Sequence, residues 1–237
     1  MCTVSFVNTG SSLVFTSNRD EKKNRDKAVF PAVLKSDGKK MFFPKDQKAS
    51  GTWFVADDKG NVAILLNGAF RKHENKPFYK KSRGVILLDL FKNENISEAF
   101  HQYDFSEIEP FQLLVYSQKK LMRLLWDGKE RHEILLNMHE SHLLSSSTLY
   151  RDEMVNFRKK SFAEFQEEHI VTPESVLDFH TTHQIEKEES IQPEIKEKYI
   201  TVSITQLVIT KESTMFFYND LLENIKQTKE IETGVII

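Results

Sequence analysis

The sequence has little cysteine, glycine or proline. Of its 237 residues, one is cysteine, eight are glycine and six are proline. A single cysteine excludes an internal disulfide and agrees with a reducing compartment. Because the few glycines never cluster, neither a phosphate-binding P-loop nor a dinucleotide-binding fingerprint is present.

The sequence also lacks a long apolar run. A bilayer span needs about 20 apolar residues, and even the apolar segment 85–91 contains Asp89. Near the N-terminus, polar and turn-forming residues interrupt the chain at 8–11, and 18–26 is strongly polar, which does not fit a signal peptide. We therefore expect a cytoplasmic protein that does not insert into membranes.

Neither sign of charge is in excess. The chain has 33 Lys and Arg against 35 Asp and Glu, a formal net charge of -2. Nucleic acids and anionic membranes select clustered Lys and Arg, whereas the basic clusters at 22–25 and 158–160 are interleaved with acids. We expect a small-molecule substrate or ligand and no nucleic-acid partner.

The bulk composition indicates one globular domain over residues 1–237. Hydrophobic residues make up 39% and charged residues 29%, a balance typical of a folded chain with a solvated surface. All-β and layered α/β architectures of this length commonly fold as a single unit.

Short strands separated by turn residues dominate the pattern. Alternating apolar and polar residues, bounded by turn chemistry, indicate antiparallel hairpins. The expected strands are 2–7 with 13–17, 52–56 with 62–66, 113–116 with 121–126, then 132–137, and finally 201–209 with 215–218.

Helical signals fall between these strands, at 82–91, 97–103 and 151–168. In the last of them, an apolar stripe is marked by Met154, Phe157, Phe162 and Phe165. A short helix is expected after Thr172, an N-cap residue followed by Pro173, and 181–197 is expected to be a surface excursion.

Strands first, helices in the middle and strands again predict an α+β domain with antiparallel sheets. Two stacked sheets need helices to cover their outer faces. The pattern is therefore consistent with a four-layer αββα sandwich.

Cys2 occupies a position with its own chemistry. When an initiator methionine is removed, the thiol and a free α-amino group belong to the same residue. An α-amine has an ordinary pKa of about 7.7–8.0, so part of it is unprotonated at neutral pH and can accept the thiol proton. Such a pairing activates an N-terminal nucleophile.

The first hairpin brings further functional groups toward this residue. A turn centred on Thr9-Gly10 would place Cys2 opposite Ser17, and a longer loop would place Cys2 opposite Arg19. In both registers, the polar segment that begins at residue 18 lies beside the N-terminus.

The charges of this segment suggest their roles. Asp20 can accept hydrogen bonds from the terminal ammonium group, and Arg19 can stabilise a thiolate or bind a carboxylate-bearing ligand. Asn18 and Glu21 flank them as candidate binding residues. A lone cysteine is more often a small buried apolar residue, and an Asn-Arg-Asp-Glu run is more often a solvated loop, but their adjacency in one hairpin favours a site.

Several motifs along the chain resemble those of the NRDE family, the transport and Golgi organisation 2-like proteins. They are Met1-Cys2-Thr3-Val4, Phe15 to Glu21, Gly51-Thr52-Trp53, Val62-Ala63 and Asn67. In order and spacing they are also distantly similar to cholylglycine hydrolase and penicillin V acylase, which are cysteine-type N-terminal-nucleophile amidases.

The resemblance implies an αββα fold and a pocket at the N-terminus. Cys2 would be the nucleophile after methionine removal, Arg19 and Asp20 would lie in the pocket, and Asn67 would donate to an oxyanion. An asparagine at the end of a strand also favours a turn, so the residues alone leave the role of Asn67 open.

Two further candidate binding residues, Ser147 and Trp53, also have structural explanations. Where the related acylases place a second pocket asparagine, this chain has the cluster 145–148, so Ser147 is a candidate binding residue. The cluster would equally serve as a loop that caps the following helix. Trp53 is a candidate pocket residue, although an aromatic residue in a strand is more often part of the core.

No metal or cofactor is expected. His139 and His142 are three residues apart, whereas a helical metalloprotease motif spaces its histidines by four, and His180 with His183 is no better. The acylase substrate is not carried over, because no pocket arginine aligns near the C-terminus.

Two functions follow. The first is a cysteine-dependent amidohydrolase that acts on a non-peptide C–N bond of a small molecule. The alternative is a non-enzymatic binding or trafficking protein for a small hydrophobic ligand such as haem, because relatives are linked to Golgi organisation and haem handling.

Overall fold

The computed structural model describes residues 2–36, 38–74, 76–148, 152–184, 187 and 193–232. The chain forms two compact units. Unit 1 comprises Met1–Arg25, His139–Glu230 and Ile236–Ile237, and unit 2 comprises Asp26–Met138 and Ile231–Val235. Because each unit draws on separated stretches of chain, neither corresponds to one continuous segment of sequence.

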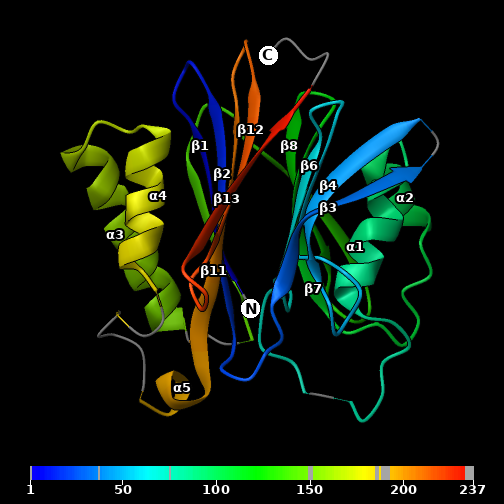
Figure 1. Ribbon diagram of the computed structural model, residues 1–237. Helices are drawn as coiled ribbons and strands as arrows, with labels where there is room; N and C mark the ends of the chain where they lie inside the picture. The colour runs from blue at the N-terminus through cyan, green and yellow to red at the C-terminus, as the bar shows by residue number, and fades with distance from the viewer. Residues whose placement is uncertain are drawn as a thin grey trace. The chain divides into compact units, whose positions relative to one another are not determined.

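Unit 1 contains a six-stranded sheet in the order β10-β1-β2-β11-β12-β13. Its central strands, β2 and β11, are long and largely buried. Strands β1 and β2 form the N-terminal hairpin (Figure 1). The strands are β1 (Cys2–Asn8), β2 (Leu13–Lys22), β10 (His142–Ser145), β11 (Tyr199–Ile209), β12 (Thr214–Asp220) and β13 (Ile225–Ile231).

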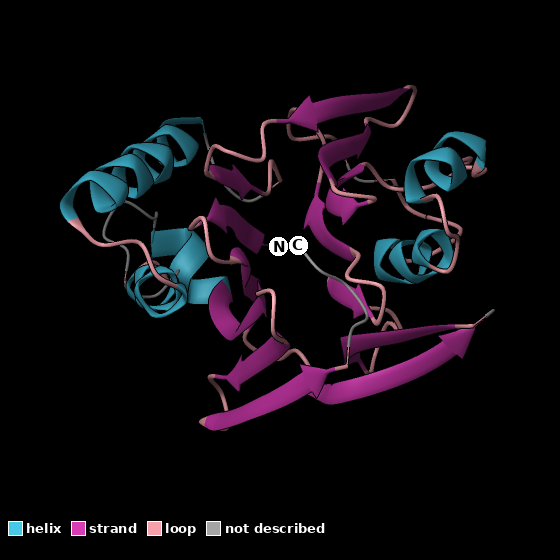
Figure 2. Cartoon of the chain, turned by 90° about the horizontal axis from the view of Figure 1, so that it is seen from above, coloured by secondary structure: helices cyan, strands magenta, loops and turns pink. Residues whose placement is uncertain are grey.

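Helices cover one face of this sheet, where α3 (Asp152–Glu168) and α4 (Pro173–Thr182) lie side by side (Figures 1 and 2). The sheet and these helices share an apolar cluster that excludes water. The short helix α5 (Pro193–Lys198) precedes β11. The buried members of the cluster are Val7, Val14, Leu143, Phe162, Val176, Phe179 and Val208.

The helix caps behave as expected. The Thr172 side chain accepts a hydrogen bond from the backbone N–H of Ser175, and the Ser175 hydroxyl accepts one from the backbone N–H of Thr172. These two bonds form a capping box, with Pro173 at the first helical position. In α3, Met154 and Phe162 are buried as predicted, but Phe157 is 47% exposed. Arg158, four residues after Met154, takes the inward position instead.

The β1–β2 hairpin has the longer of the two loops considered. Cys2 pairs with Arg19 and Asn8 pairs with Leu13, so the register with Cys2 opposite Ser17 is wrong. The backbone N–H of Thr9 donates to the carbonyl of Ser12 at 3.0 Å, and this bond closes a loop over residues 9–12.

Unit 2 contains a seven-stranded sheet in the order β3-β4-β5-β6-β7-β8-β9, which follows the chain. Every neighbouring pair is antiparallel, as a meander of hairpins requires. The strands are β3 (Ala28–Ser36), β4 (Lys39–Asp46), β5 (Phe54–Asp57), β6 (Val62–Asn67), β7 (Phe111–Ser117), β8 (Lys120–Trp126) and β9 (Arg131–Leu136).

Two helices lie on this second sheet, α1 (Arg83–Phe91) and α2 (Ile96–Gln102). A close backbone approach places α1, because a Cβ on Gly51 would lie 2.3 Å from the carbonyl carbon of Gly84. The Thr52 N–H donates to the Gly84 carbonyl at 3.1 Å. Only glycine at both positions permits this contact, which gives a physical reason for the Gly-Thr motif.

A buried ion pair joins the start of β4 to the end of β5 in unit 2. Lys39 Nζ lies 3.3 Å from Asp57 Oδ2, and both side chains are fully buried. The same ammonium group donates to the carbonyls of Phe91 and Asn93 at 2.8 and 3.0 Å, at the C-terminal end of α1. It therefore also neutralises the partial negative charge of that helix end.

The two antiparallel sheets with accompanying helices confirm the predicted α+β class. Four strands were not predicted, namely β3, β4, β10 and β13. β3 and β4 pair as an antiparallel hairpin, although the sequence pattern predicts no strand in either segment. Within the described residues, no helix has both the length and the apolar character needed to span a bilayer.

Candidate functional site

The first residue of β1 stands at the end of a row that crosses the sheet of unit 1. In that row Cys2 pairs with Arg19, Arg19 pairs with Ser203, and Ser203 pairs with Asp220. Directly paired residues have neighbouring side chains on one face of a sheet. The row therefore puts a guanidinium group on the strand next to Cys2 and a carboxylate two strands further on.

The other neighbour of β1 is β10, and it brings the predicted serine cluster to the same end of the sheet. Ser145 pairs with Thr3. Ser146 is fully buried, and its hydroxyl lies 3.1 Å from the hydroxyl of Thr148. Ser147 is partly exposed in the turn that follows. The cluster thus lies beside the start of β1, and a binding role for Ser147 stays a prediction.

Strand β2 sends the side chains of the Asn-Arg-Asp segment to two different faces. Successive strand residues alternate between faces. Asn18 contacts α4, so Asn18 and Asp20 belong to the helix-covered face, while Arg19 belongs to the other. The Asp20 carboxylate is fully buried and accepts a hydrogen bond from the Thr201 hydroxyl at 2.7 Å. Arg19 and Asp20 therefore have different surroundings, although they are adjacent in sequence.

A buried hydrogen-bond chain connects this helix-covered face to α4. His180 Nδ1 lies 2.9 Å from Asn18 Oδ1, and His180 Nε2 lies 2.8 Å from the Ser5 hydroxyl. The Asn18 amide nitrogen donates to the backbone carbonyls of His180 and His183 at 3.0 and 3.2 Å. These bonds tie both strands of the N-terminal hairpin to one helix.

The protonation state of His180 fixes the direction of these bonds. Burial, together with the electrostatic influence of the neighbouring His183 and Arg158 side chains, lowers the pKa of His180 from 6.5 to about 3. The ring is therefore neutral at physiological pH. Since the Asn18 carbonyl oxygen can only accept, Nδ1 carries the proton and Nε2 accepts from the Ser5 hydroxyl.

A buried cation lies on the same face as His180. Arg158 of α3 is 1% exposed, and its guanidinium group donates to the Thr3 hydroxyl. Thr3 follows Cys2 directly, so α3 and α4 each hold one residue of β1, at positions 3 and 5. The part of β1 that directly follows Cys2 is thus fixed from one side by buried polar contacts.

The face of β2 that carries Arg19 is lined with hydroxyl groups. Ser17 pairs with Thr205, and Thr205 pairs with Tyr218. The hydroxyls of Ser17 and Thr205 are buried and have no hydrogen-bond partner among the described residues. Such groups cost free energy unless a water or a ligand satisfies them, so this face is suited to polar recognition.

Tyr218 adds a proton donor to this face. Burial and the neighbouring Asp220 carboxylate raise the pKa of Tyr218 to about 12, while the charge of Arg19 acts in the opposite direction. Tyr218 therefore stays protonated at neutral pH. The Asp220 carboxylate accepts backbone hydrogen bonds from Leu222 and Glu223 at 3.0 and 3.1 Å, which fix its orientation.

Glu21 lies at the edge of this region. Its burial acts to raise the pKa of its carboxyl group, but the Lys22 backbone N–H, at 3.0 Å, and the charges of Arg25 and Arg19 lower it overall. Glu21 is consequently ionised at neutral pH and balances part of the local positive charge.

Two predicted site residues belong to unit 2. Asn67 ends β6, pairs with Phe111 and is followed by Gly68 in a left-handed conformation (φ 75°). Trp53 immediately precedes β5 and is 5% exposed, as a core residue would be. Their roles as oxyanion donor and pocket residue stay predictions. Within the described residues, no three His, Cys, Asp or Glu side chains gather in a way that would hold a metal ion.

Several residues around Cys2 gave no local sequence signal. His180, Thr201 and Ser203 contact or pair with the N-terminal hairpin, although they are far from it in sequence. Tyr218 and Asp220 pair with β11, the strand next to that hairpin. Nothing in their own neighbourhoods distinguishes them from ordinary strand and helix residues. Only the order of strands in the sheet brings them together.

Solved structures show the same fold at low sequence identity. A mutant conjugated bile acid hydrolase from Clostridium perfringens superposes with a TM-score of 0.61 at 12% identity, covering 100% of this chain and 96% of that one. An N-acylethanolamine-hydrolyzing acid amidase ortholog from Caenorhabditis elegans gives 0.60 at 10% identity, covering 87% and 92%. The predicted fold of N-terminal-nucleophile hydrolases is thereby confirmed.

The sequence comparison identifies the family. No curated protein sequence matches the chain. The profile of one family matches residues 1–224, which include the N-terminal hairpin, both sheets up to β12 and the helices α1 to α5. The motifs around Cys2, Arg19, Trp53 and Asn67 all lie inside that match. The chain therefore belongs to the Transport and Golgi organisation 2 family.

Proposed function

We propose that the protein is a cysteine-dependent amidohydrolase that cleaves a non-peptide C–N bond of a small molecule. The observation that carries this proposal is the register of the first hairpin, which pairs Cys2 with the buried Arg19. A cation beside a thiol favours its thiolate form, which is the nucleophile.

The fold and the polar face support the same chemistry. By their names, the two similar structures are a hydrolase of conjugated bile acids and an amidase that hydrolyses N-acylethanolamines. The hydroxyls of Ser17 and Thr205 offer hydrogen bonds to a polar substrate on the face that carries Arg19. Tyr218, protonated at neutral pH, adds a donor.

The proposed reaction begins after removal of Met1. The α-amine of Cys2 takes the thiol proton, and the sulfur attacks the amide carbonyl carbon to give a tetrahedral oxyanion. Backbone N–H groups stabilise that charge. The C–N bond then breaks, and the proton held by the α-amine passes to the leaving amine.

The second half returns the enzyme to its starting state. The acyl group remains on Cys2 as a thioester, and a water molecule, deprotonated by the same amine, attacks it. The products are a carboxylic acid and an amine, and the sulfur regains its proton. One water molecule is consumed for each amide bond broken.

The buried contacts of β1 are the device that holds the nucleophile in place. Arg158 on Thr3 and His180 on Ser5 fix the backbone directly after Cys2. A positional error of about 1 Å can cost about a hundredfold in rate. We therefore assign these two residues a positioning role with no contact to substrate.

Replacement of Cys2 tests the proposal. The wild-type protein should hydrolyse at least one member of a panel of N-acyl amino acids and N-acylethanolamines. Cys2→Ala should reduce that turnover to the uncatalysed rate, because no other cysteine can replace the nucleophile. Amine release measures turnover, and the circular dichroism spectrum and melting temperature show that the variant is folded.

Two outcomes would contradict the proposal. One is full activity of Cys2→Ala on an amide that the wild type cleaves. The other is an absence of both turnover and an acyl adduct on Cys2 across the panel, which would favour the non-enzymatic binding protein instead.

A further inference from the structure

We infer that unit 2 carries a separate binding site for a phosphate-bearing small molecule, formed by two adjoining cavities that share Lys129. Both cavities are lined only by residues of unit 2. The site does not use Cys2, so it is independent of the proposed amide hydrolysis.

The larger cavity, about 490 Å³, follows the end of β6, and we call it the Phe70 cavity. Ala69, Phe70 and Pro110 form its apolar wall, and Arg71, Lys72 and Lys129 are among its cationic residues. This combination suits a ligand with an anionic group attached to an apolar one.

The Phe70 ring is exposed, but its position is fixed. Its side chain is 50% exposed, although phenylalanine side chains are usually buried in folded proteins. The Arg123 guanidinium lies 6.0 Å from the ring centroid, and His132 meets the ring edge-on at 4.9 Å. An exposed aromatic ring held from behind in this way is a preformed contact surface for a ligand.

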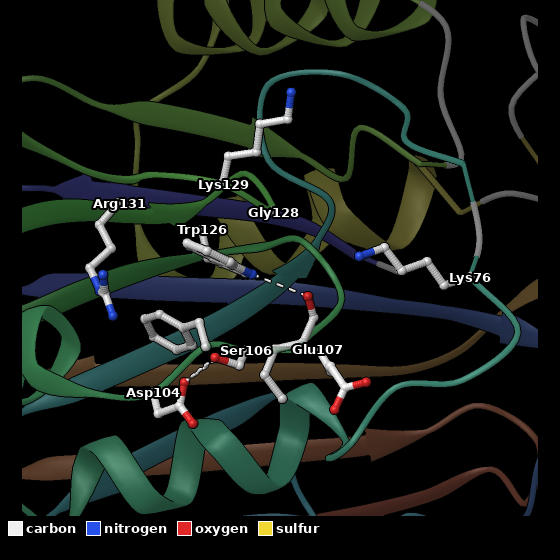
Figure 3. Close-up of a pocket in the computed structure, with 10 residues that line it drawn as sticks. Lys76, Asp104, Ser106, Glu107, Trp126, Gly128, Lys129 and Arg131 are labelled. Atoms are coloured by element: carbon white, nitrogen blue, oxygen red, sulfur yellow. Dashed lines mark hydrogen bonds between the residues drawn. The ribbon is translucent and has the colours of Figure 1, made fainter.

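The smaller cavity, about 280 Å³, lies over Trp126, and we call it the Trp126 cavity. Figure 3 shows Lys76 on one side of Trp126 and Arg131 on the other, with Lys129 on the turn at Gly128. The Arg131 guanidinium lies 5.1 Å from the centroid of Phe105 and donates to the Tyr103 carbonyl at 2.5 Å. Its orientation is therefore fixed before any ligand arrives.

Two of the three carboxylates that line the cavities have other partners. Asp104 accepts hydrogen bonds from the backbone N–H and the hydroxyl of Ser106 at 2.9 and 2.5 Å. Asp127 accepts from the backbone N–H groups of Lys129 and Glu130, both at 2.8 Å, and lies 2.7 Å from His132. Asp104 also lies 3.6 Å from Lys80 Nζ, so these two carboxylates are engaged by groups other than Lys72, Lys76 and Lys129.

The lysines, in contrast, keep their charges available. Among the described residues, the side chains of Lys72, Lys76 and Lys129 make no hydrogen bond or ion pair. The two cavities together present five Lys and Arg residues against three carboxylates. This local excess of positive charge occurs on a chain whose formal net charge is -2.

The kind of anion follows from the kind of cation. Lysine ammonium groups act as separate point charges that suit the several oxygens of a phosphate. A single carboxylate would satisfy only one of the three free lysines. A dianionic phosphate or a diphosphate therefore fits this arrangement better than a monocarboxylate.

Calorimetric titration with inorganic pyrophosphate, in a low-salt buffer free of phosphate, tests the inference. We expect saturable binding that weakens as salt is added. The double variant Lys72→Gln/Lys129→Gln should raise the Kd about tenfold or more, because it removes two charge-assisted hydrogen bonds. The matched control Lys211→Gln/Lys226→Gln removes the same charge from exposed positions of unit 1 and should leave the Kd unchanged.

Further arms identify the source of the phosphate and separate this site from the hydrolase proposal. Flotation with phosphatidic acid vesicles, compared with phosphatidylcholine vesicles, reports a lipid headgroup, while pyrophosphate reports a free phosphate compound. Cys2→Ala should bind pyrophosphate as well as the wild type does. The inference is overturned if neither probe binds, or if both double variants bind alike.

Discussion

Lys39→Met is expected to lower the free energy of unfolding by about 3–5 kcal/mol, because it leaves a buried carboxylate without its cation. Lys39 and Asp57 are fully buried and 3.3 Å apart. The substitution also removes the donor to the carbonyls of Phe91 and Asn93. Methionine has a similar volume, so the loss reports the charge and hydrogen bonds more than packing.

Urea denaturation, followed by tryptophan fluorescence, measures this effect. The matched control is Lys59→Met, which breaks a pair with Glu94 in which the two side chains are 44% and 65% exposed. Exposed pairs contribute about 0–1 kcal/mol. Equal losses in the two variants would show that the Lys39–Asp57 pair has no special role in unit 2.

His180→Ala is expected to lower the free energy of unfolding by about 3–5 kcal/mol at pH 7.5. The variant leaves the Ser5 hydroxyl and the Asn18 carbonyl oxygen without the partners they have at 2.8 and 2.9 Å. It also opens a cavity in a fully buried site. The exposed His169 provides a control, because His169→Ala should cost less than about 0.5 kcal/mol.

The same variant should change how stability depends on pH. The pKa of His180 is about 3 in the folded protein and 6.5 in the unfolded chain, so the unfolded chain binds more protons between these values. The stabilisation is complete above pH 6.5 and is lost as the pH falls toward 3. By pH 5 the wild type should have lost about 2 kcal/mol through this residue.

Unfolding free energies at pH 7.5 and pH 5 show whether this linkage exists. The gap between the wild type and His180→Ala should be about 2 kcal/mol smaller at the lower pH. A gap that stays constant would mean that the pKa of His180 is the same in the folded and the unfolded chain, which would contradict a neutral His180 ring at pH 5.

Local signals predicted much of unit 1. Thr172 and Pro173 predicted the start of α4. The apolar stripe over 151–168 predicted the extent of α3. The hairpin of β1 and β2 was predicted, but its register was open by two residues, because a shift of two keeps every side chain on the same face. The register is fixed by the hydrogen bond between Thr9 and Ser12, which closes the loop. The alternation of apolar and polar residues does not predict this bond.

The missed hairpin of unit 2 has a physical explanation. β3 is an edge strand with Pro31 at an irregularity of its register, and only parts of it are buried. Edge strands tolerate proline and charge, so they lack the alternation that marks a buried strand. In β4, Lys39 is buried because Asp57 compensates its charge, and that partner is distant in sequence.

The candidate site was also predicted only in part from local sequence patterns. Cys2, Arg19, Asn18 and Asp20 were found because they share one hairpin. Their separation onto two faces follows from alternation alone, yet the partners on each face do not. His180 and Thr201 on one face, and Tyr218 and Asp220 on the other, arrive through tertiary contacts that no local pattern encodes.

Time-resolved intact-mass spectrometry of the purified protein in iodoacetamide tests the central claim, a reactive N-terminal thiol held opposite Arg19. Because the chain has one cysteine, every adduct reports that thiol. We predict a species that lacks Met1 and gains one adduct rapidly at pH 7, and an Arg19→Leu variant that gains it several-fold more slowly. A retained Met1, or equal rates in the two proteins, would contradict the account.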